Sequence, residues 1–119
     1  MTCGDNGSPA RVTGSDAARN AAAVPLRTAE ACLRALELVA EVAEVGNLNA
    51  VSDAGVAGWL ARGGVEGAAL NVAINLPSVP AEERGALEAR ARRVTEKAAA
   101  LHAVIVDRVR TRMGLAAGA

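Results

Sequence analysis

Aromatic side chains are almost absent from this sequence of 119 residues, in which Trp59 is the only Trp and Tyr and Phe do not occur. Hydrophobic residues still make up 51% of the chain, so its core must consist of Ala, Val and Leu. Small side chains make thin contacts, so helices built from them must approach closely or recruit a second chain. We therefore expect one helical domain that oligomerises, rather than a large sandwich or α/β fold.

Neither charge is in excess, because 13 Lys and Arg residues balance 13 Asp and Glu residues. Without a basic excess, and without aromatic rings to stack on bases, a nucleic-acid partner is not expected. One histidine, His102, and two distant cysteines, Cys3 and Cys32, do not make a zinc site, so we expect no bound metal. Free thiols in a reducing compartment are favoured over a disulfide between the two cysteines.

The sequence also lacks the features of secretion and membrane insertion. Its first residues do not follow the charged-then-apolar pattern of a signal peptide. The most apolar segment is interrupted by polar and charged residues, namely Arg62, Glu66, Asn71 and Asn75. We therefore expect a cytoplasmic protein with no membrane partner.

Three helices are predicted, over residues 16–45, 52–76 and 81–113, between a loose tail at 1–15 and a frayed tail at 115–119. In the third, apolar residues alternate by four and three, at Leu87, Ala91, Val94, Ala98, Leu101 and Ile105. Pro25 predicts a kink or break in the first helix. The predicted fold is an all-α bundle of long antiparallel helices over residues 16–114. Its central helix is rich in Gly and Ala, and dimerisation completes the bundle.

The segment 46–57, with the sequence GNLNAVSDAGVA, combines a turn, a helix start and most of the candidate chemistry. Gly46 should end the first helix, because glycine tolerates a turn or left-handed backbone. Ser52 or Asp53 can cap the second helix. For Asp53 two interpretations stay open: a structural cap, or an acid oriented in a ligand site at a helix start.

Two amides, Asn71 and Asn75, lie four residues apart on one face of the same predicted helix. They suit either an interhelical hydrogen bond or a ligand contact. Asn71 is about five turns, or roughly 27 Å, from Asp53, so one helix does not bring both to one small ligand. An antiparallel second subunit could place its own Asn71 near Asp53. Arg62 and Glu66 are spaced for an i,i+4 ion pair.

The segment 46–57, the dipeptide Ala61-Arg62 and the segment 65–76 (VEGAALNVAINL) resemble the cyclodeaminase/cyclohydrolase family. This family includes the cyclodeaminase domain of formimidoyltransferase-cyclodeaminase and the methenyltetrahydrofolate cyclohydrolases. The resemblance runs from about residue 21 to the end of the last helix. It covers the later part of the domain, since the family's earlier helices and its Pro-Gly-Gly-Gly-Ser-like helix entry have no counterpart in this sequence.

The resemblance implies an all-α homodimer or higher homo-oligomer that acts on a one-carbon tetrahydrofolate substrate and holds no tightly bound cofactor. It implies one of two reactions: ring closure of 5-formimidoyltetrahydrofolate with loss of ammonia, or hydration of 5,10-methenyltetrahydrofolate to the 10-formyl form. In either, Asp53 would be the catalytic acid or base. The substrate-binding residues implied are Asn47, Asn49, Ser52, Arg62, Asn71 and Asn75.

Two other readings remain open. The chain could be a catalytically inactive helical oligomerisation module or a truncated remnant of the family. The last helix alone would also suit a coiled-coil adaptor. The turn at residues 47–53 discriminates between these readings, because an enzyme would place it beside a cleft and an adaptor has no use for it.

Overall fold

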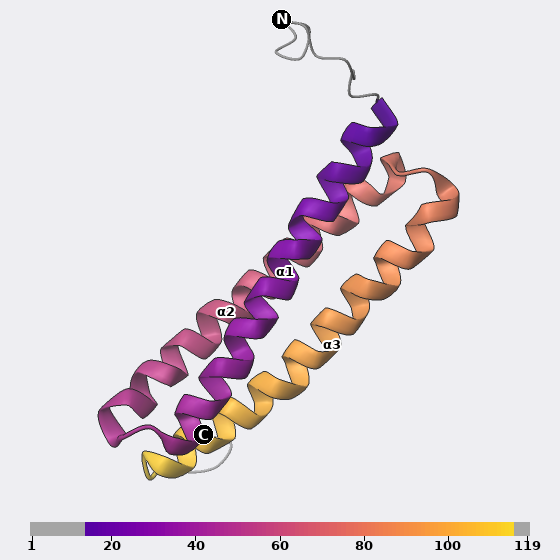
Figure 1. The fold of residues 1–119 in the computed structure, drawn as a ribbon. Helices are drawn as coiled ribbons and strands as arrows, with labels where there is room; N and C mark the ends of the chain where they lie inside the picture. Colours follow the sequence, from indigo (N-terminus) through magenta and orange to yellow (C-terminus); the bar gives the residue numbers. More distant parts are fainter. Residues whose placement is uncertain (1–13, 116–119) are drawn as a thin grey trace, which may run out of the picture.

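The computed structural model describes residues 14–115 and contains three long helices. These are α1 (Gly14–Val45), α2 (Leu48–Asn75) and α3 (Ala81–Arg112), with a short 3₁₀ helix η1 (Leu76–Ser78) before α3. The chain runs down α1, back along α2 and down again along α3, so that the helices form one elongated bundle (Figure 1). The bundle measures 60 × 29 × 19 Å. The predicted all-α bundle is therefore confirmed. Of the tails predicted at 1–15 and 115–119, residues 1–13 and 116–119 lie outside the described residues.

Each helix contributes one seam to the core, and neighbouring residues of a seam lie three, four or seven positions apart, which is close to the spacing of coiled-coil packing. In α1 the buried seam comprises Ala22, Leu26, Ala29, Leu33, Leu36, Ala40 and Ala43. In α2 it comprises Val51, Ala54, Gly58, Val65, Ala68 and Val72. In α3 it comprises Val94, Ala98, His102, Ile105 and Val109. Most of these side chains are small, as the composition predicted.

The first helix starts at Gly14, two residues earlier than predicted, and passes through Pro25 without ending. Of the kink or break predicted at Pro25, the break is therefore wrong. A proline removes one backbone hydrogen bond from a helix. Here its neighbours Ala22 and Leu26 are both fully buried in the α1 seam, and this packing holds the helix on either side of the proline.

Glycines of α2 allow close packing on its core side. A Cβ atom at Gly64 would lie 2.6 Å from the Sγ atom of Cys32 in α1, and one at Gly58 would lie 3.1 Å from Ile105 in α3. The predicted close approach of neighbouring helices is thus found at these two positions. Gly63 and Gly67 differ, because nothing lies within 4 Å of a Cβ atom built on either.

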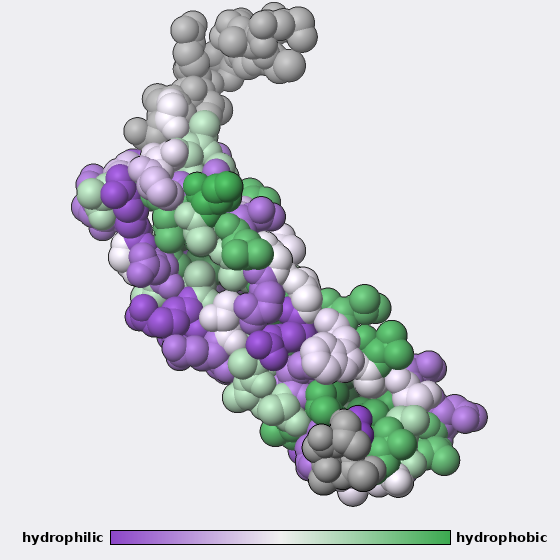
Figure 2. All heavy atoms as spheres, turned by 180° about the vertical axis from the view of Figure 1, so that it is seen from behind, coloured by the Kyte–Doolittle hydropathy of each residue, from purple (hydrophilic) through white to green (hydrophobic). Residues whose placement is uncertain are grey.

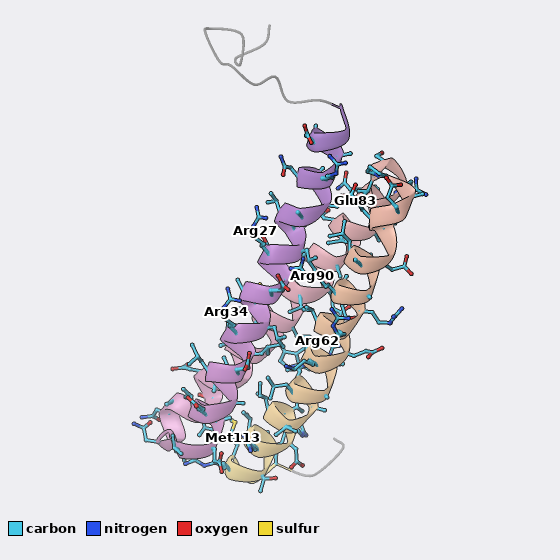
Figure 3. All side chains as sticks on the ribbon, turned by 45° about the vertical axis from the view of Figure 1, so that its right-hand side comes forward. Arg27, Arg34, Arg62, Glu83, Arg90 and Met113 are labelled. Atoms are coloured by element: carbon cyan, nitrogen blue, oxygen red, sulfur yellow. The ribbon has the colours of Figure 1, made fainter. Side chains whose placement is uncertain are left out.

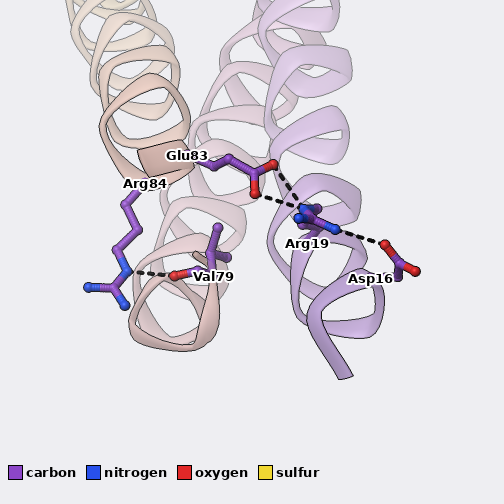
Figure 4. Close-up of polar contacts among 5 residues, drawn as sticks. All are labelled: Asp16, Arg19, Val79, Glu83 and Arg84. Atoms are coloured by element: carbon purple, nitrogen blue, oxygen red, sulfur yellow. Dashed lines mark hydrogen bonds and ion pairs between the residues drawn. The ribbon is translucent and has the colours of Figure 1, made fainter. Parts of the chain in front are cut away.

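Arginines fix the connection between α2 and α3. The Arg84 guanidinium donates to the carbonyl oxygen of Val79 at 2.7 Å (Figure 4). It also donates to the carbonyl oxygen of Pro77 at 3.0 Å. At the same end, Arg19 of α1 donates from Nε to both carboxylate oxygens of Glu83 in α3, at 2.9 and 2.8 Å. These bonds hold the turn against the start of α1.

Two arginines of α3 fix the opposite end of the bundle. Arg108 donates to the carbonyl oxygen of Ala40 at 3.0 Å, and Arg112 donates to that of Ala43 at 3.2 Å. The last carbonyls of a helix have no partner within that helix, and positive charge beside them is favourable. The basic end of α3 therefore stabilises the end of α1, where the turn into α2 begins.

Candidate active site at the start of α2

The turn between α1 and α2 is tight because it passes through Gly46. The Gly46 amide donates to the carbonyl oxygen of Val42 at 2.8 Å, and a Cβ atom at Gly46 would lie 2.6 Å from that oxygen. Gly46 ends α1 as predicted. The cause is this close approach and not a left-handed backbone, since the one glycine with positive φ among residues 14–115 is Gly114, at 72°.

Asn47 is the residue that caps α2. Its backbone is extended, with φ −69° and ψ 170°, and its side-chain oxygen accepts from the amide of Ala50 at 2.9 Å. The prediction that Ser52 or Asp53 caps this helix is therefore wrong, because the helix starts four residues earlier than expected. Asn is as good a cap as Ser or Asp, and Asn47 is the first of them that the chain reaches after Gly46.

Because Asn47 provides the cap, Asp53 is left in the second turn with an exposed side chain. It lines a shallow groove of about 300 Å³ between the end of α1 and the start of α2. The other lining residues are all apolar: Leu38, Val39, Val42, Ala50, Ala54 and Ala57. The groove thus offers a hydrophobic floor with one carboxylate on its wall, which is a common composition for a small-molecule site.

The remaining predicted site residues fall into two groups. Asn49 and Ser52 are exposed near Asp53, and the Ser52 hydroxyl donates to the carbonyl oxygen of Asn49 at 3.1 Å. Asn71 and Asn75 lie at the far end of α2, and the Asn75 amide donates to the carbonyl oxygen of Asn71 at 2.8 Å. This bond lies within one helix, so the interhelical bond considered for Asn75 is not the one observed.

Arg62 lies between these two groups, and its Nε donates to the Glu66 carboxylate at 3.0 Å. The predicted i,i+4 pair is confirmed. Within one chain, α2 therefore brings Asn47, Asn49, Ser52 and Asp53 together, and leaves the other three predicted residues further along its length.

A buried histidine is the feature that the sequence reading underestimated. The predicted α3 stripe ran through Leu101, but the buried seam runs through His102, which is 3% exposed, and Leu101 is only partly buried. Burial lowers the pKa of His102, and the positive charge of Arg62 lowers it further. Its Nε2 atom has no hydrogen-bond partner. The spacing of Ala98, His102 and Ile105, by four and then three residues, could have placed the histidine in the seam.

A second and larger hollow, of about 510 Å³, lies between α1 and α3 and is lined mostly by charged side chains. Arg90 points from α3 towards α1, and Arg34 of α1 also lines this hollow, whereas Arg27 projects outward from α1 (Figure 3). Arg90 pairs with Glu30 at 3.0 Å across this hollow. Since opposite charges face each other there, we read the hollow as a salt-bridged surface and place the candidate site at Asp53.

Comparison with known proteins assigns the family. A family model described as formiminotransferase-cyclodeaminase matches residues 10–103, which include both ends of α2. The chain belongs to this family. A curated relative, the methenyltetrahydrofolate cyclohydrolase of Methylorubrum extorquens (strain ATCC 14718 / DSM 1338 / JCM 2805 / NCIMB 9133 / AM1), is 44% identical over 73 residues.

This similarity to the cyclohydrolase covers 58% of the present chain and 35% of the relative, so the chain spans about a third of that protein's length. No solved structure matches the chain. In the described part of this formiminotransferase-cyclodeaminase family member, none of the helices is long and apolar enough to cross a membrane.

Proposed function

We propose that the groove beside Asp53 binds a one-carbon tetrahydrofolate derivative and that the Asp53 carboxylate transfers protons during cyclohydrolase or cyclodeaminase chemistry. The observation that carries this proposal is the placement of one exposed carboxylate on the wall of an otherwise apolar groove. Family membership and the printed activity of the Methylorubrum relative support folate as the substrate class.

The chemistry suits a single carboxylate. In the hydrolytic reaction, water adds to the cationic methenyl carbon and a base takes one proton from the water. N5 is then protonated, the bond from that carbon to N5 breaks, and the remaining hydroxyl proton is released to solvent as the formyl C=O forms. A carboxylate favours the cation electrostatically, accepts the first proton and returns it to N5. In the deaminating reaction, N10 attacks the formimidoyl carbon, and the same group would carry a proton to the departing ammonia. Folate is the substrate in both, and neither step requires a resident cofactor.

The neighbouring residues have separate roles in this proposal. Asn47 sets the direction of the first turn of α2 through its bond to Ala50, and so positions the wall of the groove. Asn49 and Ser52 offer an amide and a hydroxyl to the polar edge of the pterin. Arg62, Asn71 and Asn75 stay predicted ligand contacts that need a second surface to reach the groove. A homo-oligomer and a cytoplasmic location likewise stay predictions.

The experiment is to follow the absorbance of 5,10-methenyltetrahydrofolate with folded protein against the uncatalysed rate, and to measure ammonia release from 5-formimidoyltetrahydrofolate in parallel. Asp53→Asn should lower the rate by at least about a hundredfold, the usual contribution of a general acid or base. Asp107→Asn is the matched control, because Asp107 is another exposed aspartate, on α3. A rate for Asp53→Asn equal to that of Asp107→Asn would overturn the assignment.

The alternative is a non-catalytic helical module, and the split between the two groups of site residues within one chain favours it. Folded wild-type protein that accelerates neither reaction would support this alternative over the enzyme. Binding of a stable tetrahydrofolate derivative, followed by calorimetry, would then show whether the groove still holds the ligand.

A further inference from the structure

The hollow between α1 and α3 carries more positive than negative charge, although the chain as a whole is neutral. Two of its lining residues are acidic, Glu30 and Glu37. Four are basic: Arg34, Arg90, Arg93 and Lys97. The pair of Glu30 with Arg90 therefore neutralises only part of this surface, and two positive charges remain in excess. We call this surface the basic hollow.

The three basic residues other than Arg90 form no ion pair within residues 14–115. They come from both walls of the basic hollow, Arg34 from α1 and Arg93 and Lys97 from α3. A guanidinium presents a fork of N–H donors that fits phosphate or carboxylate oxygens, and an ammonium adds a compact positive charge. The basic hollow thus offers donors from two sides to one anionic group.

An apolar hollow of about 410 Å³ continues the basic hollow towards the end of α3. The two hollows share three lining residues, Lys97 among them. Beyond Lys97, α3 lines the apolar hollow with Ala100, Leu101 and Val104, and Val104 is 42% exposed. Val104 lies seven residues after Lys97, which is about 10 Å along the helix axis.

Charge and apolar surface are therefore separated end to end in the groove that the two hollows form. A docked amphipathic helix would need an apolar stripe along its whole length, with polar residues at its edges. A smaller molecule with an anionic group at one end and an apolar body at the other matches the observed order. The length available for its body is about 10 Å.

We infer that this groove binds a phosphate monoester with an apolar body, whose phosphate lies between Arg34, Arg93 and Lys97. A phosphate monoester carries close to two negative charges near pH 7, which matches the excess charge of the basic hollow. The groove shares no lining residue with the groove beside Asp53. The inferred site is therefore separate from the folate site and does not depend on the proposed function.

Hydrophobicity alone would not direct a ligand to this groove, because the chain exposes apolar side chains elsewhere. Figure 2 shows the molecule from behind, the side on which α2 lies in Figure 1, and hydrophobic side chains gather there towards both ends. Leu60 and Leu70 of α2 are 73% and 71% exposed. A test of the groove must therefore compare probes that share an apolar tail and differ in the charge of the head.

Decyl phosphate and decyltrimethylammonium are such a pair, and calorimetry below the concentration at which either forms micelles measures both. One decyl phosphate should bind per chain, at least about tenfold more tightly than decyltrimethylammonium, because charge-assisted hydrogen bonds favour the phosphate. Added salt should weaken the binding of decyl phosphate, since the basic residues are exposed. Equal affinities for the two probes would overturn the inference.

Arg93→Met and Lys97→Met should each weaken the binding of decyl phosphate about two- to fivefold, the effect of losing one exposed charge contact. Arg92→Met is the matched control, because Arg92 is also exposed but lines a groove between α2 and α3. It should keep the wild-type affinity, and circular dichroism should show equal helix content in all three variants. If Arg92→Met and Arg93→Met bind decyl phosphate equally well, the basic hollow is not the site.

Vesicles distinguish a membrane lipid from a soluble ester as the source of the phosphate. Flotation with phosphatidylcholine vesicles that contain phosphatidic acid, but not with pure phosphatidylcholine vesicles, would assign the ligand to a lipid if Arg93→Met abolishes it. Absence of flotation, together with binding of decyl phosphate, would assign it to a soluble ester. Flotation without binding of monomeric decyl phosphate would overturn the site.

Discussion

The indole of Trp59 in α2 lies edge-on against the imidazole of His102 in α3, with ring centroids 4.3 Å apart and ring planes at 82°. The tryptophan is 63% exposed, whereas the histidine beneath it is almost fully buried. Trp59 thus covers the buried, titratable imidazole of His102 where α2 meets α3. Since water reaches the imidazole poorly, its neutral form is favoured in the folded state.

The stability of the fold should therefore depend on the charge of His102. Its folded pKa lies below the unfolded value of 6.5, so the unfolded chain binds the proton more readily. This contribution to stability is fully present above about pH 6.5, and it is lost as the pH falls from there to the folded pKa. Urea unfolding at pH 7.5 and pH 5 should show a lower free energy of unfolding at the acidic pH.

His102→Leu is the comparison that isolates this effect. An apolar side chain of similar size leaves no buried nitrogen without a partner, so stability at pH 7.5 should be equal or greater. The decrease in the free energy of unfolding from pH 7.5 to pH 5 should be smaller than in the wild type. An equal loss in both proteins would assign the pH dependence to other groups.

The cap of α2 makes a second prediction. Asn47→Ala should lower the free energy of unfolding by about 1 kcal/mol, the usual contribution of an N-cap side chain. Ser52→Ala should change it by less than about 0.5 kcal/mol, because Ser52 lies inside the helix and is exposed. Thermal or urea unfolding measures both. A larger loss for Ser52→Ala than for Asn47→Ala would contradict the observed start of the helix.

Two adjacent glycines of α2 should respond in opposite directions. Gly63 faces open space, so Gly63→Ala should stabilise the monomer by about 0.5–1 kcal/mol through the backbone alone. Gly64→Ala should destabilise it by about 1–3 kcal/mol, because the new Cβ atom would press against the sulfur of Cys32. Unfolding at concentrations low enough to dissociate any dimer measures both. If both substitutions stabilise the fold, or both destabilise it, the placement of these two residues is contradicted.

The contact between Arg112 and the end of α1 provides a fourth prediction. Arg112→Met keeps a long side chain but removes the donor to the Ala43 carbonyl. The free energy of unfolding should therefore fall by about 1 kcal/mol. Arg93→Met, at an exposed arginine in the middle of α3, should change stability by less than about 0.5 kcal/mol. If both variants unfold at the same denaturant concentration, the contact does not stabilise α1.

The regular features of this fold could be predicted from the sequence. The four-and-three spacing located part of the α3 seam, at Val94, Ala98 and Ile105, Gly46 marked the end of α1, and Arg62 and Glu66 form the pair that their spacing indicated. These features depend on residues close together in the chain. The continuity of α1 through Pro25 could not be predicted, because it depends on burial against other helices.

The site was harder to predict for a related reason. Asn47 and Ser52 are both competent caps, and the choice between them depends on where α1 ends, which Arg108 and Arg112 fix from the far end of α3. The groove beside Asp53 needs Leu38 and Val42 of α1 to line it. The sequence could name the carboxylate, but only the packing of α1 against α2 shows what surrounds it.

The bundle is 19 Å across its thinnest direction, which is about two helix diameters. No point inside it is therefore more than about 10 Å from bulk water, so a bound pterin would stay wetted on one side in an isolated chain. If a second copy supplies the missing wall, each molecule should turn over more slowly as the solution is diluted. A plot of rate per molecule against protein concentration would then rise, whereas an enzyme whose site is complete in one chain would give a constant rate per molecule.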